Sequence, residues 1–435
     1  MDRLLTRLLG QEQDGRAVDL EATEMAIRSS MHHVGGVLLE RLLAEDPGYR
    51  GPSVTCGQGH QAGFVDYRHK RLVTVLSEVH LRRAYYHCVL CAHGVIPRDS
   101  QLDIVATSFS PGVRRLMARV GSKEPFDEGR LDLQELAGIV VQTKQVERVS
   151  EAIGVQVEQV ASRERRVALA GKVVLLHSVP KLYVAIDGTG VPMTPRETRG
   201  RPGKDETGQA KTREAKLGCV FTQTHLDHKG RPVRDEGSTS YVGAIENAQG
   251  FGQRIFTEAI RRGSRRAEQI NVLGDGAVWI WNIADEHFPG AIQIVDLYHA
   301  REHLSGLAKL LYGPGTPKTI AWAEARVREL DAGDLETLVA SLARLRPSTA
   351  TGKDELRKTI AYFQSNAHRM RYADFRRRGL FVGSGVVEAG CKTIVGHRLK
   401  QSGMRWTVRG ANAIIALRCC ELSGRWEAFW EARSA

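Results

Sequence analysis

The sequence predicts a multidomain α+β protein in which helical segments alternate with two strand-rich blocks. The length of 435 residues exceeds that of one ordinary domain, and 42% of the residues are hydrophobic, as in folded globular proteins. Runs that alternate apolar and polar residues are typical of strands, and they gather in residues 53–100 and 182–295. Elsewhere the apolar residues recur at helical spacing, so we expect about two to four domains of mixed type.

Changes of pattern divide the chain into consecutive segments. A break rich in glycine and proline at residues 46–52 ends the first of them. We expect an N-terminal helical segment at 1–50, a small strand-rich module at 51–100, a helical segment at 101–178, the first part of an α/β core at 179–303, an all-helical insertion at 304–380 and the completion of the core at 381–435.

The core block is expected to open with three strands, followed by a helix and further strands. The strands are predicted at 182–186, 219–224, 240–245, 270–273 and 292–295, with a helix at 251–262 before the fourth of them. A final helix is predicted to begin near Ser384, whose hydroxyl is suited to capping an N-terminus.

The charge balance favours an acidic partner. Lys and Arg number 62 against 50 Asp and Glu, which leaves a net charge of +12 and points to nucleic acid or a membrane surface. No run approaches the roughly 20 apolar residues of a membrane span, and no signal peptide is evident, so we expect a cytoplasmic protein without a membrane partner. Seven unevenly spaced cysteines argue against a disulfide framework and favour free thiols or a metal site.

Cysteines and a histidine within residues 51–100 predict a structural zinc site. Cys88 and Cys91 form a C-x-x-C pair, and Cys56 and His60 lie upstream. Zn²⁺ prefers four nitrogen or sulfur ligands in a tetrahedron, and two ligand pairs on two loops joined by a short sheet are typical of a zinc ribbon. The other histidines that compete for the fourth position are His87 and His93. A metal-free or redox-active C-x-x-C pair is the alternative.

Carboxylates follow apolar strands in the core block and predict a second metal site. These residues are Asp187, Asp275 and Asp296, and Glu388 falls in the first turn of the predicted final helix. Carboxylates from two strands and a helix can hold two Mg²⁺ (or Mn²⁺) ions, and such a pair can catalyse phosphodiester displacement. This arrangement is ribonuclease H-like. We predict Asp187, Asp275 and Glu388 as metal ligands, with Asp296 as the competitor of Asp275; for each aspartate the alternative is a turn or helix cap.

Ordered strings along the chain resemble those of bacterial insertion-sequence transposases of the Kra group, which are similar to the wider Mutator-like DDE transposases. The strings lie at residues 183–192, 215–223, 273–281, 295–299 and 383–392, within a resemblance that runs from about residue 50 to 420. The resemblance implies a DDE triad at Asp187, Asp275 and Glu388 and a helical insertion before the glutamate helix. Relatives usually carry two cysteines in the first zinc half-site, where this chain has Cys56 and His60.

Asp296 and His299 resemble the Cys-x-x-His element of Mutator-like enzymes, with Asp in place of Cys. This likeness implies that His299 orients a phosphate or a neighbouring carboxylate. A structural role of His299 near a strand end is the alternative.

The resemblance implies a DNA transposase. Such an enzyme cleaves the ends of a mobile element and joins the freed 3′-hydroxyl to target DNA, with two Mg²⁺ (or Mn²⁺) ions per active site. Its partners would be double-stranded DNA and, because two ends must be paired, further copies of the chain, in the bacterial cytoplasm at the nucleoid. Two alternatives stay open: a ribonuclease H-like nuclease or resolvase without strand transfer, and a catalytically silent DNA-binding protein derived from a transposase.

Basic residues at two places are predicted to contact DNA. The first group, Arg199, Arg201 and Lys204, follows the first core strand and resembles an AT-hook, for which a solvated loop is the alternative. The second group comprises Arg398, Lys400, Arg405 and Trp406, where basic side chains interleaved with an aromatic suit phosphate and base contacts. A helix-turn-helix is also predicted at 131–154, with its turn at 143–145.

Overall fold

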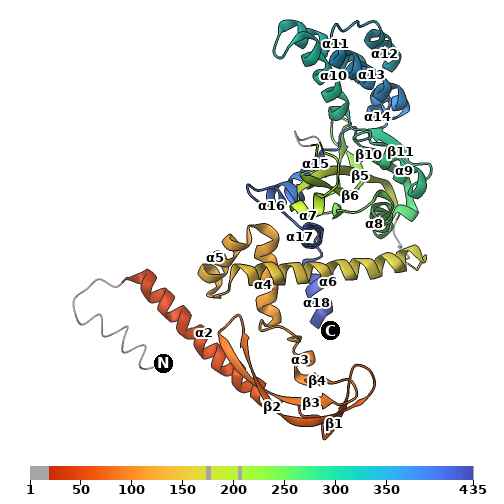
Figure 1. Cartoon of the computed structure of the whole chain (residues 1–435). Coiled ribbons are helices and arrows are strands. Elements are labelled where there is room, and N and C mark those ends of the chain that lie inside the picture. The colour runs from red at the N-terminus through yellow and green to blue at the C-terminus, as the bar shows by residue number, and fades with distance from the viewer. Residues whose placement is uncertain (1–18, 173–177, 204–207, 435) are drawn as a thin grey trace. The chain divides into compact units, whose positions relative to one another are not determined.

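The computed structural model describes residues 19–172, 178–203 and 208–434 (Figure 1). The chain divides into two compact units, residues 1–150 and 151–435. The mixed α+β composition predicted from the sequence is confirmed, since both units combine helices with a sheet.

A four-stranded antiparallel sheet forms the centre of the first unit. Its strands lie in the order β1-β2-β3-β4, so each pairs with its neighbour in sequence. Leu72, Val79, Leu81 and Ile104 form an apolar cluster that Leu39 and Leu43 of the long N-terminal helix complete. The elements are α2 (Leu20–Ala44), β1 (Ser53–Thr55), β2 (Gln61–Val73), β3 (Glu78–Cys88), β4 (His93–Val95), α3 (Pro97–Gln101), α4 (Pro111–Lys123) and α5 (Phe126–Ala137).

The predicted helix-turn-helix is only partly right. Gly138, in the left-handed region at φ +67°, ends α5, and α6 (Thr143–Leu169) begins five residues later. Residues 143–145 therefore form the first turn of α6 and not the connection, which spans 138–142. Leu136 and Val140 are 71% and 73% exposed, whereas Ile139 and Val141 of the connection enter the core.

A five-stranded mixed sheet forms the centre of the second unit. Its strands lie in the order β11-β10-β5-β6-β9, with β5, β10 and β11 parallel to one another and β6 antiparallel to both of its neighbours, β5 and β9. The expected order of three strands, a helix and further strands is confirmed. The elements are β5 (Val179–Pro192), α7 (Pro195–Thr198), β6 (Thr212–Gln223), β7 (His225–Leu226), β8 (Pro232–Val233), β9 (Ser240–Ala244), α8 (Ala248–Arg261), η2 (Ser264–Arg266), β10 (Ala267–Gly274), α9 (Val278–His287) and β11 (Ile292–Val295).

The rest of the second unit is helical, as predicted. The insertion is continuous with the helix that leaves β11, so it begins at residue 297 and not at 304. Its elements are α10 (Leu297–Tyr312), α11 (Pro317–Ala332), α12 (Leu335–Ala343), α13 (Ala350–Ser365), η3 (Ala367–Arg369) and α14 (Tyr372–Arg377). The closing elements are α15 (Gly385–Gly390), the π-helical η4 (Cys391–Gly396), α16 (His397–Leu399), α17 (Val408–Leu422) and α18 (Trp426–Ser434).

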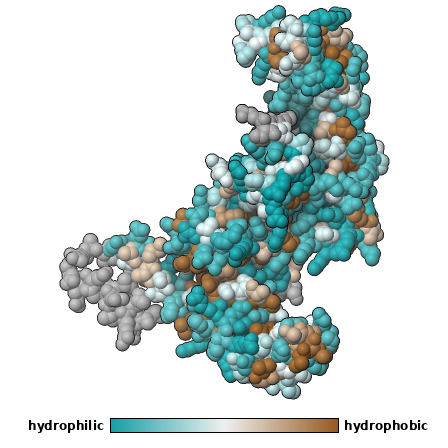
Figure 2. All heavy atoms as spheres, in the orientation of Figure 1, coloured by the Kyte–Doolittle hydropathy of each residue, from teal (hydrophilic) through white to brown (hydrophobic). Residues whose placement is uncertain are grey.

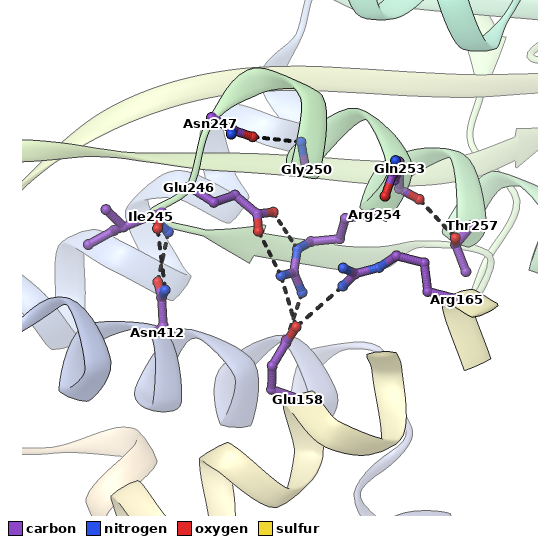
Figure 3. A network of polar contacts seen from close by, with 10 residues as sticks. All are labelled: Glu158, Arg165, Ile245, Glu246, Asn247, Gly250, Gln253, Arg254, Thr257 and Asn412. Carbon is purple, nitrogen blue, oxygen red and sulfur yellow. Dashed lines mark hydrogen bonds and ion pairs between the residues drawn. The ribbon is translucent and has the colours of Figure 1, made fainter. Parts of the chain in front are cut away.

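A buried arginine fastens α8 to the later part of α6 (Figure 3). Arg254 binds both carboxylate oxygens of Glu158 at 2.7 and 2.9 Å and Glu246 at 2.8 Å. Asn247 caps α8 by accepting the N–H of Gly250, and Asn412 of α17 bonds the backbone of Ile245. Since Arg254 is desolvated, its two carboxylate partners are needed to compensate its charge, and together these contacts hold the helices on the sheet.

Candidate functional site

The four predicted zinc ligands come together at one end of the first sheet. Cys56 follows β1 and His60 precedes β2, and the N–H of Cys56 donates to the carbonyl of His60 at 2.8 Å. Cys88 ends β3, and Cys91 lies in the turn before β4. Two turns of one antiparallel sheet thus present two ligand pairs.

The spacing of the ligand atoms fits one tetrahedral ion. All four atoms lie within 4.8 Å of one another, with Cys56 Sγ 3.7 Å from Cys91 Sγ and His60 Nδ1 3.0 Å from the same sulfur. A Zn–S bond of about 2.3 Å gives a tetrahedron with edges of about 3.8 Å. The backbone N–H of Gln58 lowers the pKa of the Cys56 thiol to about 6, which favours the thiolate that a metal binds.

The competing histidines lie outside this cluster. His93 is exposed, with Nδ1 3.3 Å from the carbonyl oxygen of Cys91, and His87 Nδ1 lies 3.5 Å from the Tyr85 hydroxyl. Of the three histidines, His60 therefore lies with the cysteines and is the one placed to act as a fourth ligand. Among the residues that the structure describes, this cluster alone brings three or more ligand atoms of Cys, His, Asp or Glu so close together.

Asp187 and Asp275 lie at corresponding places on neighbouring parallel strands. The pairing of β5 with β10 ends at Ala185 opposite Leu273, and each aspartate lies two residues further on. The expectation that Asp187 ends its strand is wrong, because β5 continues to Pro192 through its antiparallel pairing with β6. Asp187 nevertheless lies just beyond the parallel pairing, at the edge where Asp275 follows β10.

The carboxyl of Asp187 is partly buried and has several polar neighbours. Burial raises the pKa of this carboxyl, and the charge of Asp275 acts in the same direction. The thiol of Cys391 and the N–H of Gly188, at 2.7 Å, donate to it and oppose the rise, as does nearby His299. Burial and the carboxylate raise the pKa of Cys391, so the thiol remains a donor. Two carboxylates that interact in this way form a site that a cation would stabilise.

Asp296 is engaged by the backbone on both of its oxygens. It is 2% exposed, Oδ1 accepts the N–H of His299 at 2.8 Å as the cap of α10, and Oδ2 accepts the N–H of Ser384. This is the capping role that the sequence left as the alternative. The geometry therefore favours Asp275 over Asp296 as the partner of Asp187.

Glu388 is largely exposed and pairs with a lysine of its own helix. Its side chain is 53% exposed, and Oε1 binds Lys392 Nζ at 2.7 Å one turn later. Ser384 occupies the cap position of α15, but its hydroxyl makes no capping hydrogen bond, contrary to the prediction. The helix continues as a π-helix from Cys391 to Gly396. Such widened turns occur often at functional sites, and they change the direction in which a helix presents its side chains.

The helical insertion contributes groups that the sequence reasoning missed. Tyr362 of α13 donates to the carbonyl of Asp275 at 2.9 Å, and its ring lies 4.1 Å from that of His303 on α10. Burial lowers the pKa of His303 and raises that of Tyr362 to a value beyond its ordinary range. No sequence pattern links Tyr362 to Asp275, which lies 87 positions away. Cys391 could have been predicted as part of the site, because it lies one helical turn after Glu388.

The predicted DNA contacts divide into exposed and buried residues. Arg398 is 0% and Trp406 6% exposed, and the Arg398 guanidinium lies 5.0 Å from the Trp406 ring. The indole N–H donates to the carbonyl of Leu399 at 3.0 Å, so both side chains belong to the interior and not to a DNA-facing surface. The exposed members of the two groups are Arg199, Arg201, Lys400 and Arg405, whereas Lys204 lies outside the described residues. Lys400 Nζ donates to Thr189, two residues after Asp187.

The helices of the described part of the chain all lack the combination of length and hydropathy that crossing a bilayer requires.

Comparisons with known proteins give limited similarity. No family model matches the chain. A stretch of 139 residues is 27% identical to the "UPF0236 protein in vanSb 3′region" of Streptococcus gallolyticus, covering 31% of this chain and 29% of the length of that curated relative. Among solved structures, the Drosophila P element transposase strand transfer complex aligns with a TM-score of 0.25 at 11% identity, over 78% of this chain and 85% of that one. NurA bound to dAMP and manganese aligns with a TM-score of 0.10 at 12% identity, over 66% and 64%. TM-scores below 0.5 do not establish a shared fold.

Proposed function

We propose that this chain is a DNA transposase of an insertion sequence, with a ribonuclease H-like core and a structural zinc module. The observation that carries the proposal is the interacting pair Asp187 and Asp275 at one edge of a mixed sheet. The strand order β11-β10-β5-β6-β9, in which β6 alone runs opposite to the other four strands, supports a ribonuclease H-like core. The resemblance of the ordered strings to Kra-group transposases supports the reaction class.

Asp187 and Asp275 would hold a divalent cation, and Glu388 would complete the triad after leaving Lys392. Two bound Mg²⁺ (or Mn²⁺) ions would activate the attacking oxygen and stabilise the leaving one. The chain itself supplies the carboxylates, the Cys391 thiol that orients Asp187 and the Tyr362 hydroxyl that fixes the backbone of Asp275. Exposed Lys400, which bonds Thr189 beside this edge, and exposed Arg405, which follows the glutamate helix in sequence, would bind the DNA backbone.

The test is a cleavage and joining assay on DNA carrying the two ends of the encoding element, with a target plasmid. In Mg²⁺ we expect nicking at the ends and joining to the plasmid, both lost in EDTA. Asp187→Ala and Asp275→Ala should each lower the rate by roughly 10³-fold or more. Asp354→Ala, which removes an exposed carboxylate on α13, is the matched control and should leave the rate unchanged.

The alternative functions give different results in the same assay. Cleavage that depends on Mg²⁺ but yields no joined product would identify a nuclease or resolvase. Binding of the end DNA that is unaffected by EDTA, with no cleavage, would identify a catalytically silent DNA-binding protein and would refute the proposed reaction.

A further inference from the structure

The long N-terminal helix α2 is apolar on two opposite sides. One side packs within the first unit: Leu39 and Leu43 complete the apolar cluster under the sheet, and Glu40 accepts the backbone N–H of His80 at 2.8 Å. Gly36 is buried against Ser77 so closely that a Cβ would lie 1.8 Å from the hydroxyl. These residues of α2 are therefore occupied by contacts within the first unit.

The opposite side exposes an apolar stripe, defined here as Leu20, Ile27, Met31, Val34 and Leu38. Their exposed fractions are 67%, 50%, 56%, 37% and 55%. Figure 2 shows brown and tan side chains along α2 at the left of the view. A contiguous exposed apolar surface is typical of an interaction site, so we expect the stripe to bind a partner.

The spacing of the stripe is that of a coiled coil. Leu20, Ile27 and Val34 follow one another at intervals of seven, and Met31 and Leu38 lie between and after them at the complementary heptad position. Two charged residues continue the same two rows, Glu24 in one and Arg41 in the other. A partner helix with the same heptad pattern would pack knobs into holes along this face.

We propose that the stripe binds the stripe of a second copy of this chain as an antiparallel two-helix coiled coil. In the antiparallel register, Ile27 of one copy lies opposite Leu38 of the other, and Met31 lies opposite Val34. The next layer outward places Glu24 opposite Arg41, which closes both ends of the apolar centre with ion pairs. The two copies thus complement each other in shape and charge.

The charges exclude the parallel arrangement. In a parallel pair, Glu24 would face Glu24 of the second copy, and Arg41 would face Arg41. Like charges at facing core positions cost free energy and select against a pairing. The sequence therefore contains both an attractive element for the antiparallel pair and a repulsive one against the parallel pair.

The apolar area suits a weak dimer whose population depends on concentration. The exposed parts of the stripe amount to roughly 450 Å² on each copy, or about 900 Å² for a pair, at the low end of specific interfaces. The inference does not depend on the proposed catalytic function, because it concerns only the first unit and is measured without DNA.

The first test measures the mass of the full-length protein without DNA by light scattering over a range of concentrations. We expect a dimer, and Leu38→Asp should weaken dimerisation by at least about 100-fold. Val140→Asp, at an exposed apolar position outside the stripe, is the matched control and should leave the dimer intact. A wild-type monomer at high concentration overturns the proposal, as does a dimer that Leu38→Asp leaves unchanged.

The second test determines the register. Glu24→Arg and Arg41→Glu should each weaken the dimer by about tenfold, and the double variant should restore it. A mixture of Ile27→Cys and Leu38→Cys proteins with different tags should form mixed disulfide dimers under mild oxidation. Disulfide dimers of each single variant with itself, or a double variant that is not restored, would refute the antiparallel arrangement. A monomer whose introduced thiols resist labelling would show instead that another part of the chain covers the stripe.

Discussion

The two metal-binding candidates of this molecule differ in how completely the fold prepares them. The cysteine and histidine cluster of the first unit already has all four ligand atoms within 4.8 Å of one another. In the second unit Asp187 and Asp275 interact, but Glu388 points to Lys392. A closed set of four ligands is typical of a structural zinc site. Mg²⁺ sites, in contrast, usually combine one or two carboxylates with oxygen ligands from water and substrate.

The difference follows from the elements that hold the ligands. The cluster lies on two tight turns of one sheet, where the ladder hydrogen bonds fix both turns. The carboxylates come from two strands and a helix that are far apart in sequence, and the helix carries a π-helical turn directly after Glu388. Strands position Asp187 and Asp275 reliably, whereas a widened helix can rotate the glutamate.

The largest expected effect is unfolding of the β1–β4 module when the cysteine and histidine cluster is disrupted. Cys88→Ser, or removal of metal by a strong chelator, should unfold the β1–β4 module, because structural zinc supplies an apparent free energy of about 10–16 kcal/mol in small zinc modules. Circular dichroism with metal analysis measures this, and we expect about one zinc per chain in the wild type. His60→Ala should behave similarly, whereas His93→Ala, outside the cluster, is the matched control. Equal zinc content in all variants would contradict the assignment.

The next effect separates Asp296 from the metal site. Asp296→Ala removes the cap of α10 and the acceptor of the Ser384 N–H, which should lower the free energy of unfolding by about 1–3 kcal/mol. Thermal or urea unfolding measures it, with Asp285→Ala, an exposed residue of α9, as the control. If Asp296→Ala retained full stability and lost Mg²⁺ binding, the capping role would be wrong.

A further effect concerns pH. Because burial raises the pKa of Asp187, the folded chain holds this proton more tightly than the unfolded chain does. The ionised carboxylate therefore costs stability once the pH rises through the ordinary aspartate range, and this cost is complete above the raised pKa. We expect Asp187→Asn to raise the melting temperature of the metal-free protein at neutral pH and to abolish stabilisation by Mg²⁺. A lower melting temperature at neutral pH would contradict this account.

The smallest effect concerns the ion pair of Glu388. Lys392→Ala should change the free energy of unfolding by less than about 0.5 kcal/mol, because both side chains are largely exposed. By releasing Glu388 it should tighten Mg²⁺ binding modestly, by no more than about threefold. Calorimetric titration measures this, and the gain should disappear when Glu388→Gln is added. Weaker Mg²⁺ binding in Lys392→Ala would show that the lysine supports the site.

Sequence patterns predicted what depends on neighbours in the chain. The strands of the second unit, the helical insertion and the ligand pairs around Cys56 and Cys88 all carry a local signal, either a period of two, a period near four or a fixed spacing. The strand before Asp187 was predicted to end too early, because pairing with β6 extends β5 beyond its run of apolar residues.

Contacts between distant residues left no such signal. Tyr362 reaches the backbone of Asp275 only through the folded insertion, and the burial of Arg398 with Trp406 depends on how the segment after α16 packs beside β5. A basic and aromatic pattern looks the same in sequence whether the side chains face solvent or each other. For the stripe on α2, the sequence shows the spacing of the apolar residues, but only the structure shows that these residues are exposed.

The two hydrogen bonds around Asp296 have a consequence for how the insertion can vary. Asp296 accepts the N–H of Ser384, and the N–H of Leu297 donates to the carbonyl of Val382 at 2.9 Å, so the points where the chain leaves and re-enters the core are fastened together. A segment whose ends already meet adds little closure entropy when it lengthens or shortens. The helical segment between these points can therefore vary in length at little cost in free energy, while the strand edge of the core stays the same.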